Sequence, residues 1–307
     1  MKHLALAAAL ALAPMTAHAV SIGAFTDLYV FGDSLSDPGN LSGGFGNALY
    51  PSGQATNGDV WAAQVGADLG SGTNYAVGGA TAVGNPTRSD FAEQAQAFLD
   101  DDPTLGANPL AAVWFGGNDL RVATPATAQT IIQNAVGSIV ANVTTLIGAG
   151  FDSIIVFGLP DLGQLPGVNS DPFASAAARQ ASEGFNTALL GGLATLAPTG
   201  ADIQYFDTFS LFDQVLSNAG ALGFTNVMDA CVTFNADGSI ASSCAAIDPA
   251  IANTYINYDG LHPTEAVHTI LADAFVAQIA PVPLPAGALL MLTGLGGLAL
   301  ARRRRAA

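Results

Sequence analysis

A serine near the start of the chain and an Asp–His pair near its end are the best candidates for chemistry. Ser34 follows the apolar run Leu28–Phe31, and Asp259 stands three residues before His262. A serine hydroxyl is a weak nucleophile unless a neighbouring base accepts its proton. Across the turn at Gly260, Asp259 can accept a hydrogen bond from one ring nitrogen of His262 and leave the other nitrogen free for the serine. These residues predict a nucleophilic serine with a His–Asp pair.

Loops that follow predicted strands also offer three hydrogen-bond donors for a substrate oxygen that becomes negatively charged. They are the backbone N–H of Ser34, the backbone N–H of Gly79 and the side-chain amide of Asn118. A glycine lets the backbone approach a ligand closely, and an asparagine supplies a neutral donor that a carboxylate lacks. Because the carboxyl ends of parallel strands meet at one edge of a sheet, we expect these loops to converge there.

Several of these residues also have an ordinary structural interpretation. Gly32-Asp33-Ser34 taken alone is typical of a strand-to-loop turn, and Gly79 fits a turn as well. Asp33 and Asp119 have the chemistry of metal ligands or of an acid pair. We expect them instead to hold loops by accepting hydrogen bonds from backbone N–H groups.

Short apolar runs alternate with amphipathic stretches along the chain, which is typical of a parallel sheet covered by helices on both faces. We see no linker, so we expect one catalytic domain over residues 20–280. The predicted strands are Leu28–Phe31, Thr73–Val77, Pro109–Phe115, Ser153–Phe157 and Ile203–Phe206. The predicted helices are Gly58–Leu69, Asp90–Leu99, Thr127–Ile147, Ala174–Leu196, Ser210–Ser217 and one that begins at Pro263, with an irregular region over Gly223–Tyr258.

Both ends of the chain have the pattern of export signals. Residues 1–19 combine a basic start, an apolar run and the small-x-small site Ala17-His18-Ala19, which predicts a signal peptide. Residues 281–307 contain Val282–Ala286, an apolar run to Ala301 and four arginines. The run is shorter than the roughly 20 residues that span a bilayer comfortably. Either a processed tail or a plain single-pass anchor fits, and both place the domain outside the cytoplasmic membrane.

The charge of the region between these ends excludes one class of partner. Between residues 20 and 301 there are three arginines and no lysine against all 24 acidic residues, so the net charge is near −21. Such a surface repels nucleic acid and anionic membranes, so we expect no nucleic-acid partner. The two cysteines, Cys231 and Cys244, predict one disulfide in an exported protein, with two free thiols as the alternative.

Four stretches of the sequence, in this order, resemble the conserved blocks of the GDSL, or SGNH, hydrolases. They are Gly32–Asp37, Asn74–Ala80, Gly117–Asp119 and Asp259–Pro263. The resemblance looks closest to the branch of plant GDSL esterases/lipases and bacterial autotransporter esterases. It implies a flavodoxin-like three-layer α/β/α sandwich, which is the SGNH hydrolase fold.

The resemblance also implies roles for single residues. Ser34 would be the nucleophile and Asp259 and His262 its partners, while Ser34, Gly79 and Asn118 would surround the oxyanion. Gly78 would replace Gly79 if the loop were shifted by one residue, but Gly79 stands two residues before Thr81, as the family pattern suggests.

The tail resembles the bacterial VPLPA-CTERM sorting signals, relatives of PEP-CTERM, in which a membrane protease of the exosortase kind is thought to process the chain. We therefore expect an exported serine esterase or lipase that acts on an ester or lipid substrate and needs no metal or organic cofactor. A carbohydrate O-deacetylase, a phospholipase or an acyltransferase would use the same site. A non-catalytic surface or matrix protein is the alternative of another class.

Overall fold

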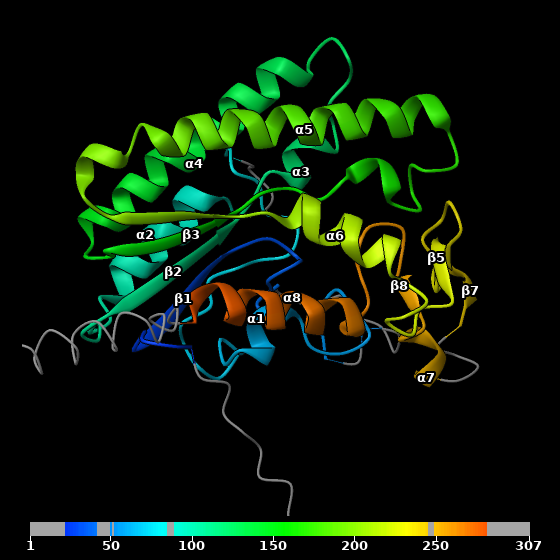
Figure 1. Ribbon diagram of the computed structural model, residues 1–307, viewed down its shortest axis with the longest axis horizontal. Helices are drawn as coiled ribbons and strands as arrows, with labels where there is room; N and C mark the ends of the chain where they lie inside the picture. The colour runs from blue at the N-terminus through cyan, green and yellow to red at the C-terminus, as the bar shows by residue number, and fades with distance from the viewer. Residues whose placement is uncertain (1–21, 42–49, 51, 85–88, 245–248, 281–307) are drawn as a thin grey trace, which may run out of the picture.

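A four-stranded parallel sheet runs through the middle of the computed structural model, which describes residues 22–41, 50, 52–84, 89–244 and 249–280 (Figure 1). Its strand order is β1 (Asp27–Gly32), β2 (Pro109–Trp114), β3 (Ser153–Phe157) and β4 (Asp202–Phe206). Each strand lies within one residue of the strand that the sequence predicts at that place. Most of their side chains are buried, as expected where helices cover both faces of a parallel sheet.

Helices cover both faces of this sheet, so the molecule has three layers (Figure 1). On one face α2 (Phe91–Asp101), α4 (Ala128–Gly148) and α5 (Pro172–Ala194) pack against Tyr29 and Phe31 of β1 and the strand residues beside them. On the other face α1 (Trp61–Gln64), α6 (Thr208–Ser217) and α8 (Glu265–Ile279) pack against Leu28 and Val30. The predicted α/β fold is confirmed, and every predicted helix except the one at α1 begins within two residues of its predicted start.

The segment over residues 73–77 forms only an isolated bridge with β1, so the strand predicted there is wrong as a regular strand. It still lies along the edge of β1, where the Val30 N–H donates to the Thr73 carbonyl (2.9 Å) and the Tyr75 N–H to the Val30 carbonyl (2.8 Å). The side-chain amide of Asn40 donates to two of the segment's carbonyls (2.8 and 3.0 Å). The ladder with β1 stops because the Gly32 N–H donates to the side chain of Gln94 (2.9 Å) and not to a carbonyl of this segment.

The helix predicted over Gly58–Leu69 is also wrong, because α1 is only four residues long. The chain turns away at Gly66, whose φ of +97° is left-handed and favours glycine. Trp61 is fully buried, and its indole N–H donates to the Ser36 hydroxyl (3.1 Å). The short helix therefore anchors the loop that contains Ser34.

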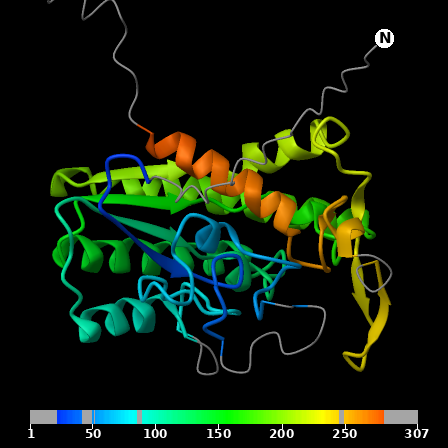
Figure 2. The same cartoon turned by 90° about the horizontal axis from the view of Figure 1, so that it is seen from below.

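The region predicted to be irregular contains regular elements. They are β5 (Asn226–Ala230), β6 (Val232–Phe234), β7 (Ile240–Ser243), α7 (Pro249–Ala252) and β8 (Tyr255–Asn257). β5 pairs with β8 in parallel and β6 with β7 antiparallel, and Figure 1 shows them together at one end of the molecule. The predicted disulfide between Cys231 and Cys244 is confirmed. Figure 2, seen from below, shows this yellow end beyond the amino-terminal end of the orange helix α8.

Helix α8 begins two residues later than the sequence predicts. Pro263 pairs with Asn257 in an isolated bridge, and Thr264 is extended (φ −75°, ψ 163°), so Glu265 is the first helical residue. Three further short elements are α3 (Gly117–Leu120) and the 3₁₀ turns Leu162–Gln164 and Ala197–Thr199.

Among the described residues, α4 alone is long and apolar enough to cross a membrane. It buries Ile132, Val136, Ile139 and Val143 in the core, however, so its apolar composition is explained by packing on the sheet. The predicted signal peptide (1–19) and the predicted tail (281–307) lie outside the described residues.

Gly116, just before α3, permits a stability test. Its φ is +113°, and a Cβ there would overlap the ring of Phe185. We expect Gly116→Ala to lower the free energy of unfolding by about 2 kcal/mol or more, since a left-handed backbone alone costs about 1–3 kcal/mol. Urea denaturation measures the change.

Gly137 is the matched control, because it lies on the exposed side of α4 and a Cβ there would meet nothing within 4 Å. Gly137→Ala should raise the free energy of unfolding by up to about 1 kcal/mol. Equal effects of the two substitutions would contradict the strain assigned to Gly116.

Candidate active site

Ser34 lies two residues after the end of β1, at the carboxyl edge of the sheet, and its side chain contacts His262. The Ser34 Oγ is 2.9 Å from His262 Nε2, although 228 residues separate the two in the chain. The other ring nitrogen of His262, Nδ1, lies 2.8 Å from Asp259 Oδ2 and 3.0 Å from Oδ1. With Nδ1 protonated toward the carboxylate, Nε2 is free to accept the serine proton. The structure thus brings the serine, the histidine and the aspartate together in a chain of hydrogen bonds.

The turn that contains Asp259 and His262 is held by hydrogen bonds to the carboxylate of Asp259. The backbone N–H groups of Leu261 and His262 both donate to Asp259 Oδ1 (2.8 Å each). The Tyr258 N–H donates to the His262 carbonyl (2.8 Å) and closes the turn from the other side. The carboxylate and the imidazole therefore hold a fixed mutual position.

Gln94 of α2 holds the end of β1 on which Ser34 depends. Its amide donates to the Gly32 carbonyl (2.8 Å), and its carbonyl accepts from the Gly32 N–H (2.9 Å). A Cβ at Gly32 would lie 3.0 Å from the Trp114 carbonyl oxygen, so the approach leaves little room for a side chain. Sequence reasoning missed Gln94, whose only signal is a polar residue among the buried positions of α2.

Charges around His262 and Asp259 shift their pKa values apart. Burial alone would raise the pKa of Asp259, but the charge of His262 and hydrogen bonds from His262, Tyr50 and Leu261 bring it down to about 2. Burial would lower the pKa of His262, but the charge and hydrogen bond of Asp259 outweigh it, helped by Asp33 and opposed by Arg121. The pKa of His262 is therefore raised, which favours transfer of a proton to its ring.

Two of the three candidate oxyanion donors are backbone N–H groups with no hydrogen-bond partner among the described residues. They belong to Ser34 and Gly79. The N–H of Gly78, the alternative to Gly79, donates instead to Asp37 Oδ2 (2.7 Å). This occupied donor favours Gly79, whose N–H is available to a ligand.

The third candidate, Asn118, lies in α3, and a hydrogen bond holds its side-chain amide in place. Its Nδ2 donates to the Ala80 carbonyl (2.9 Å), and the longer distance to Asp33 Oδ2 is 3.4 Å. One amide hydrogen is thus used to fix the side chain, and the more weakly held one remains for a substrate oxygen. Asn118 follows Gly116 and Gly117, which bring the backbone around at the end of β2.

The two acids beside these donors hold loops, as the sequence predicts. Asp33 accepts from the Leu35 N–H (3.0 Å), and Asp119 accepts from the N–H groups of Ala82 and Val83 (2.8 and 3.2 Å). Burial raises the pKa of Asp33 to about 7. Groups of three or more His, Cys, Asp or Glu side chains that could hold a metal ion are absent from the described part of the chain.

Sequence reasoning also missed Tyr50, which donates from its hydroxyl to Asp259 Oδ2 (2.7 Å). The two residues are 209 positions apart, and no local pattern around Tyr50 indicates the contact.

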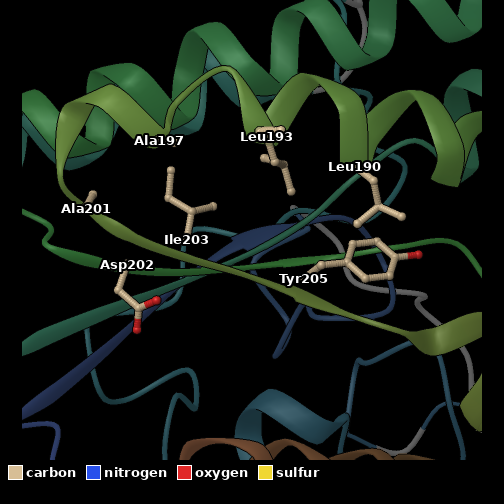
Figure 3. Close-up of a pocket in the computed structure, with 8 residues that line it drawn as sticks. Leu190, Leu193, Ala197, Ala201, Asp202, Ile203 and Tyr205 are labelled. Carbon is tan, nitrogen blue, oxygen red and sulfur yellow. The ribbon is translucent and has the colours of Figure 1, made fainter.

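One hollow in the described structure lies away from this site. It is a groove of about 330 Å³ between α5 and β4, lined by Leu190, Leu193, Ile203 and Tyr205 among others (Figure 3). The groove reaches Asp202, the first residue of β4, and so extends to the edge of the sheet opposite the carboxyl ends. Its position gives it no part in chemistry at Ser34.

Comparison with known proteins gives one family and several relatives. The model of the GDSL-like Lipase/Acylhydrolase family matches residues 28–275. Lipase 1 of Photorhabdus luminescens is 36% identical over 151 residues, covering 47% of this chain and 23% of that protein. Phosphatidylcholine-sterol acyltransferase of Aeromonas hydrophila is 32% identical over 226 residues, covering 68% of this chain and 66% of that protein. The chain thus spans less than two thirds of each of these two relatives.

One similar solved structure is that of Axe2, an acetylxylan esterase from Geobacillus stearothermophilus. It is 18% identical, with a TM-score of 0.45, and covers 85% of this chain and 97% of its own. This likeness adds nothing to the fold described above.

The two histidines of residues 20–280 should titrate differently. The ordinary pKa of a histidine is about 6.5. We expect His262 to titrate above that value, because Asp259 stabilises its charged ring. His268 is fully buried and beside His262, which lowers its pKa to about 3, so it should stay neutral across the same range. NMR titration of the ring resonances measures both.

Asp33→Asn tests how much the charge of a neighbouring carboxylate contributes to the pKa of His262. Removing this neighbouring carboxyl should lower the pKa of His262 and leave His268 neutral, because Asp33 supports the charged ring. A wild-type His262 that titrates at or below the ordinary value would contradict this account of the site.

Proposed function

The chain belongs to the GDSL-like lipase/acylhydrolase family, and from this membership we propose that it is a serine hydrolase that cleaves carboxylic esters. The observation that carries the proposal is the continuous contact from Ser34 Oγ to His262 Nε2 (2.9 Å) and from His262 Nδ1 to Asp259 Oδ2 (2.8 Å). It lies at the edge where the free N–H of Gly79 and the amide of Asn118 also stand.

In the first half of the reaction, Ser34 Oγ attacks the ester carbonyl carbon and passes its proton to His262 Nε2. Asp259 stabilises the imidazolium that forms, and it stays ionised because its pKa is about 2. The carbonyl oxygen takes up negative charge and accepts from the N–H groups of Ser34 and Gly79 and from the amide of Asn118. The C–O bond then breaks, and the alcohol leaves with the proton from His262.

The second half repeats these steps with water. His262 removes a proton from the water molecule, the resulting hydroxide attacks the acyl carbon, and the acid leaves while Ser34 regains its proton. An alcohol in place of water would yield a new ester. The similarity to an acyltransferase of Aeromonas hydrophila therefore supports acyl transfer as a second candidate activity at this site.

The neighbours of Asn118 suit the oxyanion role. Turning the weakly held amide hydrogen from Asp33 to the substrate gives up only a 3.4 Å contact. The pKa of Asp33, raised by burial to about 7, also keeps part of its population uncharged near neutral pH, which reduces repulsion of the oxyanion.

We also propose that the enzyme is exported, and that an exosortase-like protease processes its tail. The support is the signal pattern of residues 1–19 and the motif, apolar run and arginines of residues 281–307. The disulfide between Cys231 and Cys244 is in keeping with an oxidising compartment.

Substitution of the nucleophile tests the proposed reaction. We expect Ser34→Ala to abolish labelling by a fluorophosphonate probe and to lower hydrolysis of p-nitrophenyl esters by about 10⁶-fold, by analogy with other serine hydrolases. Ser217→Ala is the matched control, because Ser217 is exposed on α6 and bonds only to the Asp213 carbonyl within its own helix.

Asn118→Ala tests the proposed oxyanion donor in the same assays. It should lower kcat by roughly 10²–10³-fold, the usual effect of losing one oxyanion donor. Labelling or hydrolysis that survives Ser34→Ala would overturn the serine mechanism. Esters of different acyl length, acetylated glycans and phospholipids, assayed with the wild-type enzyme, show which substrate class it hydrolyses. The same assays with added alcohol separate hydrolysis from acyl transfer.

The intact mass of the exported protein tests the processing of both ends. We expect the mature chain to begin near Val20 and to lack Arg302–Arg305. A mass that includes residues 302–307 would contradict processing and support a plain anchor.

A further inference from the structure

A tyrosine from outside the catalytic turn contacts the carboxylate of Asp259. The hydroxyl of Tyr50 donates to Asp259 Oδ2 at 2.7 Å, and the Tyr50 side chain is buried, with 7% of the residue exposed. The contact joins Tyr50 to the turn that contains His262, although 209 positions separate Tyr50 from Asp259. It is as short as the contacts within the triad itself.

The four donors around this carboxylate divide its two oxygens between them. Oδ1 accepts from the N–H groups of Leu261 and His262, and Oδ2 accepts from Tyr50. The imidazole Nδ1 lies 2.8 Å from Oδ2, so it shares that oxygen with the tyrosine. Rotating the carboxylate would break the bond to Tyr50 as well as those to the backbone.

Tyr50 remains a donor throughout the pH range in which such enzymes work. Burial and the nearby charge of Asp259 raise its pKa far above the ordinary value of a phenol. The hydroxyl therefore keeps its proton while the carboxylate keeps its charge, so the direction of this hydrogen bond does not change with pH.

The packing around Tyr50 holds its ring in place. Tyr50 lies in a buried cluster with Cys231, Val232, Ala252 and Tyr258. Its ring meets that of Tyr258 edge to face, with centroids 5.5 Å apart and planes at 84°. The position of the hydroxyl is thus set before substrate binds.

The disulfide lies in the same cluster and ties it to the triad turn. Cys231, bonded to Cys244, donates from its N–H to the Asn257 carbonyl (3.1 Å). The N–H of Val232 donates to the carbonyl of Tyr258 (2.7 Å), the residue before Asp259. One packed unit therefore supports both Tyr50 and the turn that it contacts.

We propose that Tyr50 is a positioning residue of the catalytic triad, which fixes the orientation of the Asp259 carboxylate and limits how strongly that carboxylate supports His262. This inference rests on the proposed ester hydrolysis. Because Tyr50 and the His262 ring share Oδ2, the tyrosine withdraws part of the negative charge that would otherwise stabilise the imidazolium.

Tyr50→Phe tests the role, because it removes the hydroxyl and keeps the ring. We expect kcat to fall roughly tenfold with KM little changed, less than the ~100-fold that a 1 Å misplacement can cost. The acid limb of kcat/KM should also move up by about half a pH unit, because Asp259 then supports the charged ring more strongly. Asp33 and Arg121, the other charged groups that act on His262, are unchanged by the substitution.

Tyr255→Phe is the matched control. Tyr255 packs against the same cluster, but no hydrogen bond from its hydroxyl to a described residue is present. It should leave kcat and the pH profile as in the wild type. NMR titration of His262 provides a second readout, in which Tyr50→Phe should raise the pKa of the ring and Tyr255→Phe should not.

A Tyr50→Phe enzyme with wild-type kcat and pH profile would overturn the inference, even if its melting temperature fell, because the hydroxyl would then serve stability alone. Loss of activity with an unshifted His262 titration would also overturn it. Neither result would affect the proposed function, which fails only if activity survives Ser34→Ala.

Discussion

Buried carboxylates at one edge of a parallel sheet must find hydrogen-bond donors, and the structure of this site depends on that requirement. An ionised carboxyl group that loses water is costly unless donors replace it. Here most of the donors are backbone N–H groups of neighbouring loops, so satisfying each acid also fixes a loop. Asp37 holds the loop at Gly78, and Asp119 holds the loop at Ala82. Asp259 holds its own turn, and Gln94 does the same for the end of β1 without a charge.

The two histidines near the start of α8 show that the hydrogen-bond partner of a buried imidazole decides the direction of its pKa shift. His262 and His268 are both strongly desolvated, which by itself lowers the pKa of each ring. His262 has a carboxylate at Nδ1, so its pKa is raised. The Nδ1 of His268 accepts from the backbone N–H of Trp61 (3.2 Å), and its Nε2 has no partner within the described residues. The first suits proton transfer and the second suits packing, although only six positions separate them.

The sequence predicts the elements whose signal is local and misses those built from distant contacts. The strands β1 to β4 and the long helices α4 and α5 have apolar runs or periodic faces, and their bounds agree closely with prediction. The segment at 73–77 departs from it because the Gly32 N–H donates to Gln94, and helix α1 departs from it because the chain turns at the left-handed Gly66. The triad residues could be proposed because their motifs are local. The contacts of Gln94 and Tyr50 span 62 and 209 positions, so no periodicity indicates them.

The turn around Asp259 affects what a substitution there can reveal. This carboxylate accepts from the backbone N–H groups of Leu261 and His262 as well as from the imidazole and Tyr50. Replacing it with alanine removes a charge and also releases two backbone groups that shape the turn. The resulting loss of rate would combine an electrostatic part with a conformational part, and kinetics alone would not separate them. A structure of such a variant is therefore needed before its rate can be assigned to charge.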